Sequence, residues 1–252
     1  MGCQQLTGSK TSGSLATASR QYEQGQYGSA IKALSDFLRR EPKGSARCEA
    51  HYLRGLCYRN QGRHQTVMAI RDFEAAVAGG CRGRVVGLAH TALGHTYFEG
   101  GEKPIQKALH HYQQALAALD QSPPQDAVLY RLGVCFQRRG DWAKADEYLR
   151  RCSQDFGKSE FAEKSQRRMG ARNFRLQVGA YANLTHARKK IGQLNRSGWR
   201  SDMSRYNQGG KMLYMVRTGQ YQSYAAARQN LQRLVRLERQ AYIVAAQGQR
   251  FR

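Results

Sequence analysis

Acidic side chains are scarce in this sequence. The chain has 252 residues, with 18 Asp and Glu against 41 Lys and Arg, which gives a formal net charge of +23. Such an excess of one sign favours a polyanionic partner, whether nucleic acid, anionic lipid or a carboxylate-bearing polymer, and it carries no information about the fold. The sequence also lacks any run approaching the roughly 18 apolar residues of a membrane-spanning helix, so it predicts no such helix.

Motifs for catalysis and metal binding are absent as well. The sequence contains no His-Glu-x-x-His, no Cys-x-x-Cys, no Gly-x-x-x-x-Gly-Lys-Ser/Thr and no nucleophile elbow. The adjacent His110 and His111 lie in a predicted helix, where neighbours point about 100° apart, so they cannot chelate as an i, i+4 pair does. A glycosidase would have to draw its carboxylate pair from Asp202 and Glu238, the only two in the last third. We expect no enzymatic activity, no cofactor and no metal site.

The size and composition of the chain fit a folded protein with more than one domain. Hydrophobic residues make up 40% of the sequence, which is enough for packed cores. At roughly 100–200 residues per domain, the length fits one or two domains. We expect two, because the periodicity of the last third differs from that of the rest.

A repeat of 39 residues organises the first two thirds. Gly55, Gly94 and Gly133 stand in similar strings, each followed by an aromatic residue three positions later and by a second glycine seven positions later. The second glycine predicts the end of a helix. A small residue then precedes a large apolar one by four positions, which marks one face of a second helix. These pairs are Ala69 with Phe73, Ala108 with Tyr112 and Ala145 with Leu149, and an earlier copy runs from Gly25 to Pro42.

The predicted helix pairs resemble the tetratricopeptide repeat, a helix-turn-helix unit with small residues where its two helices touch. Residues 140–145, Gly-Asp-Trp-Ala-Lys-Ala, are close to the family pattern. The two middle copies are similar to Sel1-like relatives, because seven residues separate Gly62 from Ala69 and Gly101 from Ala108, against five in the outer copies. We therefore expect longer turns inside the middle repeats.

Four such pairs, with a short charged helix as a cap, predict an all-α solenoid over residues 15–172. The family's geometry implies that the first helix of each pair lines an inner groove, which binds a peptide or a protein partner. A spacer or dimerisation role is the alternative. The groove residues that this geometry implies are Tyr52, Leu56, Arg59, Asn60, Thr91, His95, Phe98, Tyr130, Val134, Gln137 and Arg138.

The cysteines do not dictate a disulfide framework. There are six, and the one in the N-terminal tail leaves an odd set of five. Cys57 and Cys135 share a repeat position with Thr96, which indicates small buried residues between helices. Cys48 and Cys81 lie near repeat ends and can pair if the compartment is oxidising.

The last third alternates between polar and apolar residues. Strands are predicted at residues 173–181, 199–206, 212–221 and 241–245, with helices capped by Asn183 and Ser223. The order βαββαβ predicts an α+β sandwich of the ferredoxin-like or RNP-like kind. Two helices cover one face of its sheet and the other face is open.

Two half-motifs make this assignment more specific. Residues 176–181, Leu-Gln-Val-Gly-Ala-Tyr, and residues 213–221, Leu-Tyr-Met-Val-Arg-Thr-Gly-Gln-Tyr, each end a strand in a glycine and an aromatic residue before a helix. They are similar to the SPOR domain, and the resemblance covers about residues 173–246. It implies binding to peptidoglycan glycan strands stripped of their stem peptides, as found at bacterial division septa, with no catalytic activity.

Strand alternation gives the candidate glycan-binding residues. If Leu176 and Val178 pack under the helices, their neighbours face the open side. A stripped glycan carries a lactyl carboxylate on every second sugar and many hydroxyls, so it calls for cations, amides and flat apolar surface. Gln177 matches a glycan-facing Gln of the family, whereas Met215 stands where the family commonly has Arg, so Arg217 is the expected cation. The full set is Arg175, Gln177, Leu213, Met215, Arg217 and Ile243.

A soluble scaffold that binds RNA is the alternative function. Residues 173–252 contain 15 Lys and Arg against 2 acidic residues, a net charge of +13. RNA-recognition motifs share the βαββαβ order, but they stack bases on aromatic residues of the two central strands. The open-face positions Gln177, Met215 and Arg217 are not aromatic, so nucleic acid is the weaker hypothesis.

The N-terminus has the composition of a flexible tether, with small polar residues through residue 14. Gly2 and Cys3 resemble the cleavage end of a bacterial lipoprotein signal, which implies a lipid on Cys3. Myristoylation of Gly2 competes with this reading, although Leu6 stands where that pattern needs Ser or Thr. An unmodified cysteine is the third possibility.

These observations predict an adaptor of the bacterial cell envelope, lipid-anchored in the periplasm. Residues 1–14 form the tether, residues 15–172 hold a protein or peptide partner, and residues 173–252 bind peptidoglycan glycan. We expect membrane contact through the lipid anchor only, and a role in cell division or wall remodelling.

Overall fold

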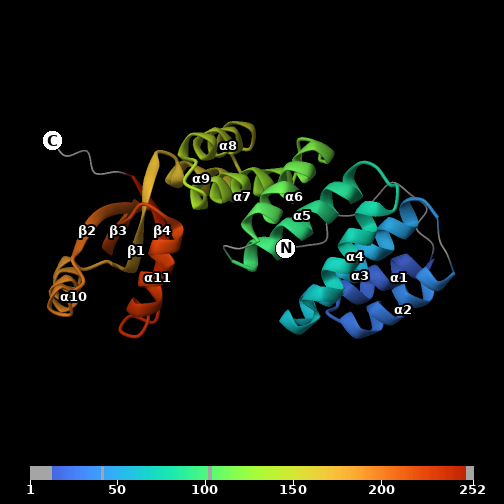
Figure 1. Ribbon diagram of the computed structural model, residues 1–252, viewed down its shortest axis with the longest axis horizontal. Helices are drawn as coiled ribbons and strands as arrows, with labels where there is room; N and C mark the ends of the chain where they lie inside the picture. The colour runs from blue at the N-terminus through green and yellow to red at the C-terminus, as the bar shows by residue number, and fades with distance from the viewer. Residues whose placement is uncertain (1–12, 41–42, 102–103, 248–252) are drawn as a thin grey trace. The chain divides into compact units, whose positions relative to one another are not determined.

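The computed structural model describes residues 13–40, 43–101 and 104–247, and it contains a run of helices followed by a small sheet (Figure 1). The chain divides into two compact units, residues 1–132 and 133–252. Within the described ranges, no helix is long and apolar enough to cross a membrane.

Four helix pairs and a capping helix form the repeat region, as predicted. The turns inside the outer pairs are short, at residues 24–26 and 139–141, whereas the α3–α4 turn includes a 3-10 segment, Arg63–Gln65, and α6 begins only at Ile105 after α5 ends at Glu99. The longer middle turns are thereby confirmed. The helices are α1 (Gly13–Glu23), α2 (Tyr27–Arg39), α3 (Ser45–Gln61), α4 (Thr66–Ala78), α5 (Arg84–Glu99), α6 (Ile105–Ala118), α7 (Gln125–Arg138), α8 (Trp142–Asp155) and α9 (Glu160–Arg168).

The repeated glycines lie where the two helices of a pair cross. A Cβ added to Gly94 would stand 2.6 Å from the ring of Tyr112, and one added to Gly55 or Gly133 would stand equally close to its partner helix. These close approaches explain the spacing of 39 residues, because each glycine admits the large side chain of its own repeat. The contacts join Gly55 to Phe73, Gly94 to Tyr112 and Gly133 to Leu149.

Replacing Gly94 with alanine should lower the free energy of unfolding by about 1–3 kcal/mol, because the added methyl group overpacks the contact with Tyr112. Gly28→Ala in α2 is the matched control, since its Cβ would meet only Gln61, at 3.9 Å. Urea unfolding followed by far-UV circular dichroism measures both variants. Equal stability of the two would contradict the overpacking account.

A disulfide joins Cys48 in α3 to Cys81 in the loop after α4. This is the pairing that the sequence allowed for an oxidising compartment. Cys57, Cys135 and Cys152 are buried between helices, in agreement with the small-residue slot predicted for the first two.

The sheet region has the predicted βαββαβ order. Its four strands are antiparallel in the spatial order β2-β3-β1-β4. Asn183 and Ser223 cap the two helices, since their side chains accept hydrogen bonds from backbone N–H groups of the first turn. The elements are β1 (Ala171–Tyr181), α10 (Leu184–Arg196), β2 (Ser201–Gln208), β3 (Lys211–Tyr221), α11 (Tyr224–Leu234) and β4 (Tyr242–Gln247).

One face of this sheet forms the core with both helices. Leu176 and Val216 are fully buried against Ala187 of α10 and Ala227 of α11. Because side chains alternate along a strand, the neighbours of these core residues face the opposite, open side.

The compact units divide at residue 132, inside α7, whereas the predicted domain boundary lies at residue 172. The packing of the last helix pair explains the difference. The ring of Trp142 in α8 lies 5.1 Å from that of Phe174 in β1, and Asp146 accepts a 2.8 Å hydrogen bond from Arg172. The second unit therefore includes α8 and α9 together with the sheet.

Candidate functional site

The open face of the sheet carries polar and charged side chains at its centre. Gln177 of β1 stands between Arg217 of β3 and Tyr242 of β4 in the strand register. In an antiparallel sheet, residues that stand opposite each other project from the same face. The structure therefore places five of the six predicted residues on the open face: Arg175, Gln177, Leu213, Met215 and Arg217.

Ile243, the sixth predicted residue, lies on the other face. It pairs with the buried Leu176 and packs against the core under the helices. The prediction was wrong by one position, and a shift of one residue moves every side chain of a strand to the opposite face. Tyr242 and Val244 take the open-face positions of β4 instead.

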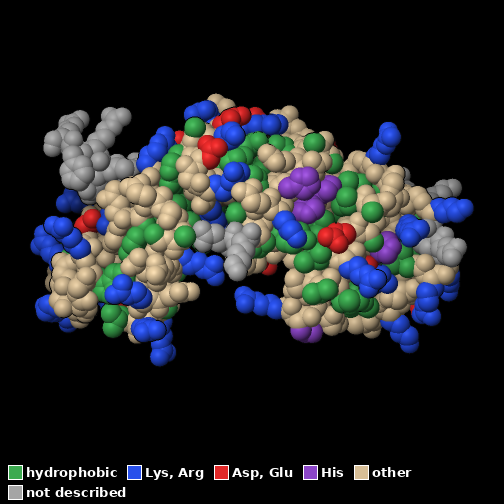
Figure 2. Space-filling model, viewed as in Figure 1, with side chains coloured by type: hydrophobic (Ala, Val, Ile, Leu, Met, Phe, Trp, Pro, Cys, Tyr) green, Lys and Arg blue, Asp and Glu red, His purple; other side chains and the backbone are tan. Residues whose placement is uncertain are grey.

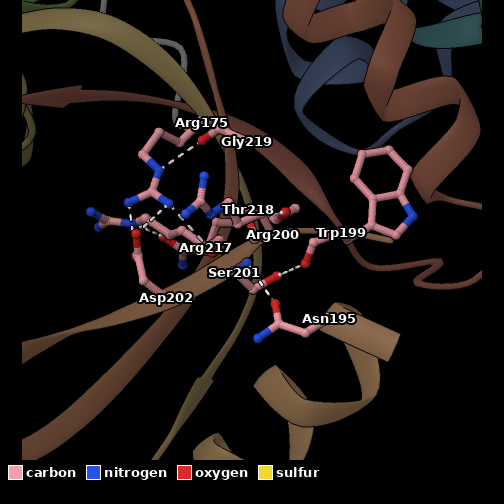
Figure 3. A network of polar contacts seen from close by, with 10 residues as sticks. Arg175, Asn195, Trp199, Arg200, Ser201, Asp202, Arg217, Thr218 and Gly219 are labelled. Atoms are coloured by element: carbon pink, nitrogen blue, oxygen red, sulfur yellow. Dashed lines mark hydrogen bonds and ion pairs between the residues drawn. The ribbon is translucent and has the colours of Figure 1, made fainter. Parts of the chain in front are cut away.

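Arg175 forms a bidentate ion pair across the open face. Its two terminal nitrogens each donate a 2.8 Å hydrogen bond to a carboxylate oxygen of Asp202 in β2, and its Nε donates to the Gly219 carbonyl at 2.9 Å (Figure 3). A fourth hydrogen bond, at 3.5 Å, runs from the guanidinium to the Arg217 carbonyl, and Asp202 neutralises the charge of Arg175. Asp202 is an addition to the predicted residues of this face.

Arg217 lies beside this pair and has no carboxylate of its own. Its Nε stands 3.4 Å from the Gln177 side-chain oxygen, and its Nη atoms donate no hydrogen bond to the described part of the chain. Burial and then the nearby Arg175 lower the pKa of Arg217 from its usual value, while Asp202 opposes them. Arg217 therefore brings an uncompensated positive charge to the face, with terminal donors available for an anion.

Gln177 supports its neighbours and is itself covered. Its side chain is only 3% exposed, and its Nε2 donates a 2.6 Å hydrogen bond to the Tyr242 hydroxyl. This corrects the expectation that Gln177 presents its amide to a ligand. Tyr242 is 50% exposed, so a ligand can contact its ring and hydroxyl in place of the Gln177 amide.

The glycine and aromatic endings of β1 and β3 have a structural reason. Gly219 has a φ of +66°, and a Cβ there would lie 2.3 Å from the Tyr221 hydroxyl. The register between β1 and β3 shifts at this point, as in a β-bulge. A Cβ added to Gly179 would likewise stand 3.1 Å from the ring of Tyr181, although the backbone φ of Gly179 is not positive.

The start of β2 is fixed to the bulge by hydrogen bonds. Thr218 donates to the Arg200 carbonyl at 2.8 Å, and the Ser201 backbone N–H donates to the Asn195 side chain at 2.9 Å (Figure 3). Because these bonds set where β2 begins, they also place Asp202 opposite Arg217 and within reach of Arg175.

The predicted groove residues of the first unit are partly accessible. Leu56, Thr91 and Phe98 are buried, and Thr91 donates a hydrogen bond to the Gly87 carbonyl within its helix. A partner cannot reach these three side chains as they stand, which corrects their assignment. The remaining residues, Tyr52, Arg59, Asn60, His95 and Tyr130, are at least partly exposed.

The predicted groove residues of the second unit face the sheet region. Gln137 is fully buried and shares hydrogen bonds with Arg168, while the guanidinium of Arg138 lies 4.5 Å from the centre of the Tyr224 ring. Val134, Gln137 and Arg138 line a small cavity with Phe174 and neighbouring residues. Their assignment to a partner groove was therefore wrong, because the sheet region covers this surface.

A metal site needs about three ligating side chains close together. Among the described residues, no group of three or more His, Cys, Asp or Glu lies close enough to hold a metal ion. His90 and His111 approach within 3.0 Å through their Nδ1 atoms, a contact between helices that the sequence does not predict. Cys3, the predicted lipidation site, lies outside the described residues.

Comparison with known families agrees with this architecture. Residues 170–245 match the model of the SPOR domain, and residues 15–66 and 127–159 match two models of the tetratricopeptide repeat. No curated protein matches the chain.

One solved structure supports the fold of the helical part. The chain is similar to a tetratricopeptide repeat protein from Parabacteroides merdae, with 20% identity and a TM-score of 0.50 over 61% of this chain and 56% of that one. It also matches a crystal structure of MamA with 21% identity and a TM-score of 0.48, over 59% of this chain and 79% of that one.

Both kinds of module act by binding. SPOR domains imply peptidoglycan binding and tetratricopeptide repeats imply protein interaction, and neither is catalytic. The chain is thus a tetratricopeptide repeat protein with a C-terminal SPOR domain.

Proposed function

We propose that this protein is an adaptor of the bacterial cell envelope, without catalytic activity of its own. The SPOR domain holds stem-peptide-free glycan strands on the open face of its sheet, and the repeats hold a protein partner. Cys3 carries the lipid that anchors the chain in the periplasm. The adaptor acts where the wall is divided or remodelled.

The charge of Arg217 is the observation that carries the glycan assignment. A stripped strand presents a carboxylate on every second sugar, and a guanidinium with available Nη donors can bind a carboxylate in bidentate fashion. Asp202 neutralises Arg175, so the open face keeps one positive charge at its centre. Tyr242 and Met215 add an aromatic ring and an apolar surface against which sugar rings can pack.

The disulfide supports a periplasmic location. Disulfides persist in oxidising compartments such as the periplasm and are rare in the cytosol. The Cys48–Cys81 bond is therefore easier to reconcile with an envelope protein than with a cytosolic RNA scaffold. The central strands also keep Gln177, Met215 and Arg217 at the positions where an RNA-recognition motif has aromatic residues.

Replacing Arg217 with alanine should weaken binding to stripped peptidoglycan by about 10- to 100-fold, which corresponds to a lost hydrogen bond between charged groups. Co-sedimentation with sacculi, before and after an amidase removes the stem peptides, measures the affinity. Arg205→Ala is the matched control, because Arg205 is an exposed arginine of β2 that pairs with Tyr214 on the helix-covered side.

Binding that rises with stripping, falls in Arg217→Ala and persists in Arg205→Ala would support the proposal. Equal binding to intact and stripped sacculi would refute the glycan assignment. Tighter binding to single-stranded RNA at the same salt concentration would favour the alternative scaffold.

A further inference from the structure

The two helices of the SPOR domain carry many cations on the surface that faces away from the sheet. Lys and Arg side chains gather over α10 and around the end of α11 (Figure 2). We call this the helical surface, and define it by seven exposed residues: Arg188, Lys189 and Arg196 of α10, Arg228 and Arg233 of α11, and Arg236 and Arg239 of the following loop.

These seven cations have no acidic partners in the described part of the chain. Residues 171–247 contain only two acidic residues, Asp202 and Glu238. Asp202 is bound to Arg175 on the open face, and Glu238 accepts a 2.9 Å hydrogen bond from Lys190. The positive potential of the helical surface is thus uncompensated, and it lies opposite the candidate glycan site. Such a surface attracts a second polyanion.

An exposed leucine lies within this charged surface. Leu237 is 58% exposed in the loop after α11, where Arg236 precedes it and Arg239 follows after Glu238, whose carboxylate is paired with Lys190. A leucine in such a position gains nothing from a hydrophilic polyanion. Cations around an apolar side chain are typical of segments that lie on a membrane surface, where the cations meet headgroup phosphates and the apolar group enters the interface.

Nucleic acid fits the same surface less well. Single-stranded nucleic acid binds where bases stack on aromatic side chains. The exposed positions of α10, α11 and the loop at 235–240 hold no Phe, Tyr or Trp. Tyr224, the aromatic residue of α11, instead packs edge-on against Phe174.

We propose that the helical surface docks on an anionic phospholipid bilayer, with headgroup phosphates on the seven cations and Leu237 in the interface. The SPOR domain then has two binding faces, the sheet for glycan and the helices for the membrane. Membrane contact extends beyond the lipid anchor that the sequence suggests.

Binding of the full chain to vesicles tests this proposal. The probe is phosphatidylglycerol mixed with phosphatidylcholine, with pure phosphatidylcholine as the neutral reference. The test variant replaces Lys189, Arg196, Arg228 and Arg233 with Gln. The matched control replaces one Lys and three Arg that are exposed in the first unit, Lys32, Arg63, Arg71 and Arg82.

The wild-type chain should bind anionic and not neutral vesicles, and the test variant should lose about 10²- to 10³-fold in affinity. The control variant has the same net charge as the test variant. Its loss of affinity for anionic vesicles should be at least tenfold smaller. Leu237→Ser should weaken binding to vesicles and leave binding to soluble polyanions such as heparin unchanged.

Equal losses in the test and control variants would overturn the proposal, because attraction would then depend on net charge alone. Vesicle binding that is indifferent to Leu237→Ser, together with tighter binding to single-stranded RNA at matched salt, would overturn it in favour of nucleic acid. All seven cations are exposed, so the variants should fold, and unchanged far-UV circular dichroism verifies it. Binding of the test variant to stripped sacculi reports separately on the glycan site.

Discussion

Reduction of the Cys48–Cys81 disulfide should lower the free energy of unfolding of the first unit by about 4 kcal/mol. The two cysteines are 33 positions apart, and opening a loop of that length returns this much conformational entropy to the unfolded chain. Thermal unfolding by far-UV circular dichroism, with and without a thiol reductant, measures the loss. In an oxidising compartment, the bond therefore contributes a large share of the net stability of a domain.

The double variant Cys48→Ser, Cys81→Ser is the control for this experiment. It should be destabilised as much as the reduced wild type, and it should no longer respond to reductant. A reduced wild type with the stability of the oxidised protein would show that the disulfide is dispensable. That result would remove one support for a periplasmic location.

Acid should destabilise the first unit through His95. Burial, and then the charges of Arg131 and Arg59, lower the pKa of His95 from its usual 6.5 to about 3. Below pH 6.5 the unfolded chain binds a proton at this position and the folded chain does not, so stability falls as the pH falls. At 1.36 kcal/mol per pH unit, the loss reaches about 3 kcal/mol at pH 4.5 and about 4 kcal/mol at pH 3, where the folded chain also begins to bind the proton.

Hydrogen exchange in peptides from α5 and α6 measures this local stability at pH 7.5 and pH 4.5. His95→Gln is the comparison variant, since glutamine does not titrate and can still hydrogen-bond the Tyr112 hydroxyl, which lies 2.7 Å from His95 Nδ1. It should lose less stability than the wild type over this interval. Part of the loss should remain, because the pKa of His111 is also lowered, to about 4, by burial and by His90. Equal losses in both proteins would contradict the assignment to His95.

The repeat architecture could be predicted because its signals are local. Glycine at a helix crossing and a large side chain four residues after the next small residue recur at fixed spacing, and these residues touch in the structure, as Gly94 and Tyr112 do. The N-caps at Asn183 and Ser223 were equally local. Such features depend on sequence positions that lie close together, so one chain is enough to recognise them.

The open face was only partly predictable, because its geometry depends on strand order and register. Tyr242, Ile243, Val244 and Ala245 form a continuous apolar run, so their alternation gives no sign of which side faces the core. Pairing with β1 decides it and brings Tyr242 to Gln177. The ion pair of Arg175 and Asp202 spans β3, so it also required the β2-β3-β1 order.

Contacts between helices set a similar limit in the repeats. His110 and His111 were judged as neighbours on one helix, whereas His111 meets His90 of α5. The buried position of Gln137 follows from Arg168 of α9, far along the sequence. The repeat pattern in the sequence does not predict which side chains of different helices meet.

We propose that the open face binds stripped glycan, and an NMR titration of the isotope-labelled chain with soluble stripped glycan oligosaccharides tests this proposal. We expect saturable shifts at Arg217, Met215 and Tyr242, with the helical surface unchanged. Peptide-bearing fragments should produce weaker shifts at the same residues. Shifts confined to α10 and α11, or an open face that does not respond to the stripped glycan, would contradict the account.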